Sequence, residues 1–165
     1  MGISERRRQQ GPTCRGQVCF VCGLSAEIRL RLERHTFRLD YPARATLAYE
    51  GEPADRLIAV CTGSLRLLSH REDGRAQVLS VTHAGGLVGL HSALLARPLP
   101  FSVESREPTT AWVMPWRAVR AQLADLPELW PRLALAAAVR HHETLTELKR
   151  SPFLRLVHLL LNATR

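Results

Sequence analysis

Residues 45–90 read ATLAYEGEPADRLIAVCTGSLRLLSHREDGRAQVLSVTHAGGLVGL. Short apolar runs alternate there with turn residues such as Thr62-Gly63 and Asp73-Gly74. Regular short strands separated by Gly and Asp turns are typical of an antiparallel barrel or roll. The segment Arg71–Arg75, which lies between two such runs, is typical of a hairpin turn. The stretch therefore predicts the centre of an antiparallel β-roll.

The strand pattern continues on both sides of this stretch and is bounded by helices. Predicted strands span residues 37–41, 46–49, 57–61, 64–68, 76–81, 102–104 and 111–114. Ser25 is a good N-cap and precedes apolar residues, which predicts a short helix over about 25–35. A second short helix is predicted over 116–123. The predicted fold class is α+β, with a jelly roll flanked by short helices.

A longer helix is predicted after the roll. Asp125-Leu-Pro127 supplies a cap and a proline that the first turn of a helix tolerates. Ser151-Pro152 ends the helix, because a proline in mid-helix removes a backbone hydrogen bond. Between these points the apolar residues follow a helical stripe, which fits either an intramolecular core or an interface with a second copy.

The composition is that of a folded, basic protein. Hydrophobic residues make up 45% of the chain, and no apolar run approaches the ~18 residues of a membrane span. The basic N-terminus has no apolar stretch behind it, so a cytoplasmic location with reduced thiols is expected. A net charge of +8 favours an anionic partner such as nucleic acid, although scattered arginines also fit solvated faces. No Ser/His/Asp, P-loop or paired-carboxylate pattern indicates an enzyme.

The order of motifs in residues 45–90 resembles the effector domain of the catabolite-activator/FNR (CRP/FNR) family of bacterial transcription regulators. The motifs are Gly51-Glu52, Leu57, Val60-x-x-Gly63-x-Leu65-Arg66, Asp73-Gly74 and Gly85-x-x-x-Gly89, followed by the helix over 127–149. The resemblance extends from about Cys19 to Arg165. It implies a roll like the cyclic-nucleotide-binding domain, a long dimerisation helix and then a winged helix-turn-helix.

The resemblance also implies domain boundaries and partners. The implied segments are a cysteine-containing arm over 1–22, a sensor roll over 23–123, a dimerisation helix over 124–150 and the start of a DNA-binding domain over 151–165. The implied homodimer interface consists of Leu133, Ala137, Leu145 and Leu148. A complete winged helix-turn-helix needs about 60 further residues. DNA is therefore expected as a partner only through that missing domain, and RNA polymerase is a candidate partner of the complete protein.

The effector pocket implied by the resemblance contains Gly89, Leu90, His91 and Arg97. In the family's cyclic-nucleotide binders, a Glu after the glycine contacts the ribose and a later Arg-Ser or Arg-Thr pair binds the phosphate. Here Leu90 stands at the Glu position and residues 99–101 stand at the Arg-Ser position. A buried phosphate without a paired cation is costly, so cyclic-nucleotide binding by the usual route is not expected. His91 is interpreted as a polar lining residue in preference to a haem ligand.

The four cysteines are the candidate metal ligands. Cys14, Cys19 and Cys22 lie together near the N-terminus, whereas Cys61 lies alone in the roll. This arm resembles the FNR branch of the family, which holds an oxygen-labile 4Fe–4S cluster with three arm cysteines and one roll cysteine. The roll cysteine of that branch corresponds to Trp112 here, which leaves Cys61 as the candidate fourth ligand.

The residues alone leave several uses of these cysteines open. Four thiolates satisfy either a 4Fe–4S cluster or tetrahedral zinc. Cys19-x-x-Cys22 could instead be a redox dithiol, and Cys22 and Cys61 could be small buried hydrophobic residues. The leading hypothesis is a sensor of oxygen or redox state with an Fe–S cluster. The alternatives are a stand-alone interaction module or truncated paralogue with zinc, thiol-redox chemistry or no site, and a roll that binds a small effector or haem.

Overall fold

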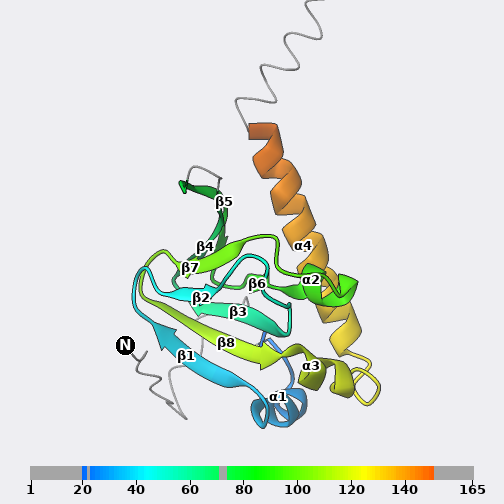
Figure 1. The fold of residues 1–165 in the computed structure, drawn as a ribbon. Coiled ribbons are helices and arrows are strands. Elements are labelled where there is room, and N and C mark those ends of the chain that lie inside the picture. Colours follow the sequence, from blue (N-terminus) through cyan, green and yellow to red (C-terminus); the bar gives the residue numbers. More distant parts are fainter. Residues whose placement is uncertain (1–19, 22, 71–73, 151–165) are drawn as a thin grey trace, which may run out of the picture.

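The computed structural model describes residues 20–21, 23–70 and 74–150 (Figure 1). The elements in chain order are α1 (Ala26–Glu33), β1 (Phe37–Tyr41), β2 (Thr46–Ala48), β3 (Arg56–Thr62), β4 (Ser64–His70), β5 (Ala76–His83), β6 (Leu87–Val88), α2 (Leu90–Leu95), β7 (Ser102–Ser105), β8 (Thr109–Pro115), α3 (Trp116–Gln122) and α4 (Leu129–Arg150). Most of the predicted arm, the centre of the predicted 71–75 turn and the segment 151–165 lie outside the described residues.

Two four-stranded antiparallel sheets form the roll. Their strand orders are β1-β8-β3-β6 and β2-β7-β4-β5. The centre of β3 is buried on both faces, because Leu57 and Ala59 face the helices while Ile58 and Val60 face the space between the sheets. A continuous apolar run is what a strand buried on both faces requires. The predicted jelly-roll fold is therefore confirmed, with short helices and a long C-terminal helix.

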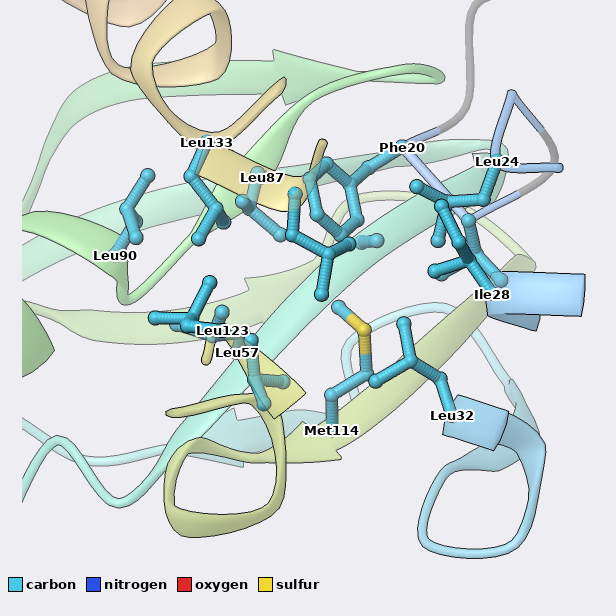
Figure 2. Packing of buried hydrophobic residues seen from close by; sticks show 14 of the residues in the cluster. Phe20, Leu24, Ile28, Leu32, Leu57, Leu87, Leu90, Met114, Leu123 and Leu133 are labelled. Atoms are coloured by element: carbon cyan, nitrogen blue, oxygen red, sulfur yellow. The ribbon is translucent and has the colours of Figure 1, made fainter. Parts of the chain in front are cut away.

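The helices pack on the outer face of the first sheet and close one end of the roll. Leu32 of α1, Met114 of β8 and Leu133 of α4 belong to one cluster of buried side chains in this layer (Figure 2). Phe20, from the segment before α1, joins the same cluster. Burial of a Leu or Met side chain contributes about 1.5–3 kcal/mol, so this layer fixes how α1, α3 and α4 sit on the sheet.

The predicted short helices are confirmed, and two small elements were not predicted. Ser25 caps α1, and its hydroxyl accepts a hydrogen bond from the Ile28 amide at 3.4 Å. The unpredicted elements are β6 and α2, which have two and six residues. Neither is long enough to display a hydrophobic period. None of the described helices is long and apolar enough to cross a membrane.

Helix α4 begins later than predicted. Turns occupy the residues after α3, and the helix starts at Leu129 rather than at Asp125-Leu-Pro127. Pro131 consequently falls in the first turn of the helix. The amides of a first turn have no partner within the helix, so a proline at this position costs little.

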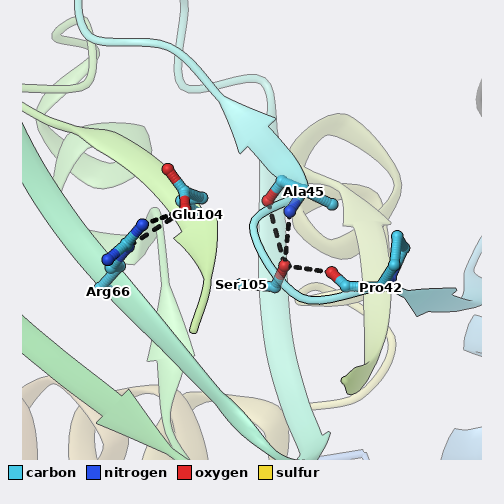
Figure 3. Close-up of polar contacts among 5 residues, drawn as sticks. All are labelled: Pro42, Ala45, Arg66, Glu104 and Ser105. Carbon is cyan, nitrogen blue, oxygen red and sulfur yellow. Dashed lines mark hydrogen bonds and ion pairs between the residues drawn. The ribbon is translucent and has the colours of Figure 1, made fainter. Parts of the chain in front are cut away.

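Polar side chains tie the second sheet together (Figure 3). The guanidinium of Arg66 on β4 donates two hydrogen bonds to the Glu104 carboxylate, which is directly opposite on β7. The fully buried Ser105 hydroxyl accepts a hydrogen bond from the Ala45 amide at 2.8 Å and donates to the Pro42 carbonyl at 2.5 Å. Ser105 therefore holds the turn between β1 and β2 against the end of β7.

Replacement of Ser105 with alanine is expected to destabilise the fold by about 1–3 kcal/mol, because the half-buried Ala45 amide loses its side-chain acceptor and the buried Ser105 hydroxyl its hydrogen bond to the Pro42 carbonyl. Denaturant unfolding followed by circular dichroism measures this loss. Ser69→Ala is the matched control, since Ser69 is only half-buried on the adjacent strand β4 and should change stability by less than about 0.5 kcal/mol. Equal losses for the two variants would contradict the assigned role.

Candidate functional site: a cavity between the roll and α4

A cavity of about 370 Å3 lies between the roll and α4. Its walls come from β4, β5, β6, α2, the segment before β7, and the second half of α4. The lining residues include Leu67, Ser80, Val88, Gly89, His91, Phe101, Arg140, His141, Thr144 and Glu147. Apolar walls with a few polar groups are typical of small-molecule sites.

The start of α2 brings only part of the predicted effector pocket to this cavity. Gly89 and His91, both named in that prediction, line it. Leu90 instead points into the hydrophobic core, and Arg97 is exposed and is not among the described lining residues. The helical turn after Gly89 carries Leu90 away from His91, and Arg97 follows the end of α2, so neither side chain lines this cavity.

Gly89 is required by the local backbone. Its φ is +93°, and a Cβ there would lie 2.6 Å from the Arg56 carbonyl oxygen. Positive φ and close backbone approach are both conditions that favour glycine. The junction between β6 and α2 therefore packs directly on β3, which fixes the position of His91 at the cavity wall.

Helix α4 contributes the polar groups that sequence reasoning missed. Arg140, Thr144 and Glu147 lie at i, i+4 and i+7 and share one face of the helix. The Ser80 hydroxyl of β5 donates a hydrogen bond to Glu147 Oε1 at 3.1 Å, which connects α4 to the second sheet. The signal was available in the sequence, because the face that is apolar at Leu133 becomes polar from Arg140 onward.

The predicted dimer-interface residues do not share one surface. Leu133 is buried inside its own chain, and Ala137 is half-buried against the same core. Leu145 is 45% exposed, and the side chain of Leu148 lies outside the described residues. Leu133 and Leu145 are twelve positions apart, which places them about 120° apart around a helix of 3.6 residues per turn. Leu133 is therefore a core residue, which corrects the prediction.

The exposed face of α4 carries a different set of apolar residues. Leu135 is 64% exposed, and Val139 and Leu145 are nearly half-exposed. At 3.6 residues per turn, Leu135 and Leu145 lie about 80° apart and both face away from Leu133. Val139 lies about 120° from Leu145, and both Val139 and Leu135 border a cavity next to Phe20 and Gly86 of the protein body. Helix α4 therefore has one face in the protein and another with exposed apolar groups.

Cys61 is the described member of the predicted cysteine set. It lies on β3, is 5% exposed and belongs to the same buried cluster as Phe20 and Val21. Ala59 pairs with Trp112 of β8, and Cys61 follows Ala59 on the same face of β3. The pairing of β3 with β8 shifts register at Cys61, and Trp112, at the position that the resemblance gives to the roll cysteine of the FNR-like branch, packs against the same cluster as Cys61.

The other predicted metal ligands, Cys14, Cys19 and Cys22, lie outside the described residues. Within the ranges that the structure describes, no three His, Cys, Asp or Glu side chains are grouped as a metal site. The described cluster does contain Phe20 and Val21, which stand between Cys19 and Cys22 in the chain. An apolar wall around a thiol is compatible with an Fe–S cluster, because limited solvent access is one property that such sites control.

Comparison with known proteins adds a family match. Residues 38–125 match the model of the family described as "Cyclic nucleotide-binding domain". The matched segment runs from β1 to the residues after α3, so it contains both sheets of the roll.

Individual relatives agree with this match. A CRP-like cAMP-activated global transcriptional regulator of Mycobacterium tuberculosis is 29% identical over 106 residues, which cover 64% of this chain and 47% of that protein. The chain thus spans about half the length of the curated relatives it matches.

Two solved structures are also similar to this chain. The catabolite activator protein of Thermus thermophilus is 27% identical, with a TM-score of 0.63 and coverage of 79% of this chain and 61% of that one. A cyclic nucleotide-binding domain from Methylobacillus flagellatus is 25% identical, with a TM-score of 0.65 and coverage of 76% and 72%.

Proposed function

Because the chain belongs to the cyclic nucleotide-binding domain family, we propose that it is the sensor and dimerisation module of a CRP/FNR-type transcription regulator. The observation that carries this proposal is the double role of α4. Its inner face lines the cavity through Arg140, Thr144 and Glu147, while its outer face exposes Leu135 and Leu145. Occupation of the cavity can therefore alter a surface available for dimerisation.

This role is regulatory rather than catalytic. It would be exercised in the cytoplasm, on DNA that a further domain of the complete regulator binds.

Sedimentation velocity of the 165-residue chain tests the proposed dimerisation. A homodimer at micromolar concentration is expected, because paired leucine-rich helices bury their exposed apolar groups. A protein that stays monomeric up to about 100 μM would contradict the proposal. Its dimerisation free energy would then be weaker than about −5 to −6 kcal/mol.

For the signal, we propose an Fe–S cluster held by Cys14, Cys19, Cys22 and Cys61. The burial of Cys61 together with Phe20 and Val21 supports this assignment, and Trp112 of the neighbouring strand packs against the same cluster. When bound, such a cluster would supply redox and oxygen sensitivity. The residues of this chain would exclude water from the Cys61 thiolate and connect the arm to the layer that also holds α4.

Protein purified without oxygen is expected to show visible absorbance and to contain about four irons and four sulfides per protomer. Cys61→Ser should remove this signal, because the roll would lose its ligand. Ala59→Ser is the matched control: it places the same hydroxyl on the same strand and face and leaves every cysteine intact. Circular dichroism checks that both variants fold.

Colourless protein without iron would contradict the Fe–S assignment. Zinc in place of iron would support the tetrahedral zinc alternative. Full retention of the spectrum in Cys61→Ser, with the control also unchanged, would remove Cys61 from the ligand set.

A second candidate signal is a small effector molecule in the 370 Å3 cavity. Its mixed lining of Phe101, His91 and Arg140 favours this alternative. Cyclic nucleotide by the usual route is not proposed, because Leu90 is buried at the position where a ribose ligand would be needed and Arg97 is exposed outside the lining. Calorimetry with cAMP tests this exclusion of the usual route. Saturable cAMP binding that persists after the Arg140 charge is removed would contradict it, because Arg140 would then not be what holds the phosphate.

A further inference from the structure

A second cavity lies on the other side of Arg140. It has a volume of about 270 Å3, which corresponds to roughly nine water molecules at about 30 Å3 each. Its apolar wall is formed by Phe20, Leu87, Leu135, Ala136 and Val139. Arg140 lines both cavities, whereas Phe20, Thr82 and Ala136 line only this one.

Two polar atoms at this cavity lack hydrogen-bond partners within the described part of the chain. Thr82 is 3% exposed, and its Oγ1 atom is buried without a partner. The Arg140 side chain is 16% exposed, and its Nη1 atom is likewise buried without a hydrogen bond. A buried donor without an acceptor is costly, and a buried guanidinium more so.

The nearest carboxylate compensates Arg140 only weakly. Glu143 Oε2 lies 3.6 Å from Arg140 Nη1, beyond hydrogen-bond distance, and the Glu143 side chain is 53% exposed. By comparison, Arg66 makes two hydrogen bonds to the better-buried Glu104. The charge of Arg140 is therefore available to a stronger acceptor that displaces the half-exposed Glu143 carboxylate.

The floor of the cavity is preformed. Thr82 packs directly against the turn before β6, because a Cβ at Gly86 would collide with its methyl group. The same turn is held to β3, where the Gly85 amide donates to the Val60 carbonyl at 2.9 Å and the Val60 amide donates to the Gly86 carbonyl at 3.0 Å. A rigid floor lowers the entropy cost of binding a ligand.

We propose that this second cavity binds a small organic monocarboxylate with an apolar body. The carboxylate accepts hydrogen bonds from the Arg140 guanidinium, and the Thr82 hydroxyl provides a further donor. The apolar body packs against Phe20, Leu87 and Val139. A single negative charge matches the Arg140 guanidinium, whose Nη1 atom is buried, while the second arginine at this cavity, Arg132, is exposed to solvent. The site is separate from the proposed effector cavity and does not require that the chain belong to a DNA-binding regulator.

Isothermal titration calorimetry of the 165-residue protein with benzoate, phenylacetate and hexanoate tests the proposal, with benzamide as the neutral comparison. At least one acid is expected to bind with saturation, about tenfold or more tightly than the amide. Arg140→Gln is expected to reduce the affinity about tenfold or more. Arg106→Gln is the control for net charge, because Arg106 is an exposed arginine in the loop between β7 and β8.

Ala136→Leu identifies which cavity is occupied. It adds volume to the second cavity only, and leucine is a good helix former. This variant should weaken binding of the acid while α4 stays helical by circular dichroism. Unchanged affinity would place the ligand elsewhere and overturn the proposal.

Three other results would also overturn the proposal. One is equal affinity for benzoate and benzamide, and another is an Arg140→Gln variant that binds the acid as tightly as the Arg106→Gln control does. The third is the absence of saturable binding for all of the acids up to about 10 mM, which corresponds to a very weak affinity. Sedimentation measures the proposed dimerisation separately, with and without the acid, because Leu135 borders this cavity and also belongs to the proposed seam. A monomeric protein that binds carboxylate would therefore refute the proposed function and leave this site intact.

Discussion

A variant with glutamate at both Leu135 and Leu145 is expected to sediment as a monomer. Both side chains are exposed on the outer face of α4, so the substitution should leave the protomer folded. In a two-fold symmetric pair of helices, each residue occurs twice, and the variant would bring four carboxylates into an apolar seam. Lost burial alone, at about 1.5–3 kcal/mol for each leucine, should weaken association about a thousandfold or more.

The matched control is Leu30→Glu. Leu30 is an equally exposed leucine on α1, far along the chain from α4, and its substitution should leave the dimer unchanged. Leu133→Glu should behave differently from both, because that side chain is buried in the protomer core and its charge would unfold the chain rather than separate two folded copies. A dimer that persists in the double variant would refute the assigned seam.

Replacement of Gly63 with alanine is expected to lower stability by about 3 kcal/mol or more. Gly63 has a φ of +79°, and a Cβ there would lie 2.5 Å from Thr109 Oγ1 and 2.6 Å from the Pro108 carbonyl oxygen. The displaced Thr109 hydroxyl also accepts from the Ser64 amide at 3.2 Å and donates to the Ser64 carbonyl at 3.1 Å, and both atoms are buried. Strain, collision and lost hydrogen bonds therefore combine at one position.

Gly51→Ala provides the comparison for this variant. Gly51 has a similar φ of +85°, but its added Cβ would meet no atom within 4 Å. Only the backbone strain remains there, at about 1–2 kcal/mol. Thermal unfolding should therefore show a fall in Tm of about 6–12 °C for Gly63→Ala and a clearly smaller fall for Gly51→Ala. Similar losses at both positions would show that the contact with Thr109 does not matter.

The sequence predicts the fold correctly where the residue types of a segment match both its backbone conformation and its burial. The run from Leu57 to Cys61 is apolar throughout because β3 is covered on both faces, and Ser25 caps α1 as its position indicates. Helix α2 was not predictable, since it has only six residues and begins at a glycine with left-handed backbone. Its existence depends on the close approach of Gly89 to β3, which is a tertiary contact.

The candidate site was predicted less completely than the fold. Gly89 and His91 follow from the resemblance, whereas Arg140 and Glu147 come from a helix far along the chain and meet α2 only through folding. The dimer interface was also predicted incompletely. One apolar stripe along α4 was predicted, whereas the helix has a buried face that contains Leu133 and an exposed face that contains Leu145. Leu133 and Leu145 both fit a helical period, but 3.6 residues per turn carries them to different sides over twelve positions.

The two halves of α4 are attached to the protein by different kinds of contact. Leu133, near the start of the helix, is packed in the core, whereas the second half is held by a hydrogen bond from Ser80 to Glu147. We therefore take Leu133 as the point about which the helix can tilt. The distance along the axis from Leu133 to Arg150 is about 25 Å, at 1.5 Å per residue. A tilt of about 5° at the pivot would therefore move the end of the helix by about 2 Å. A small rearrangement of side chains beside the roll would thus become a displacement of about 2 Å at the end of α4.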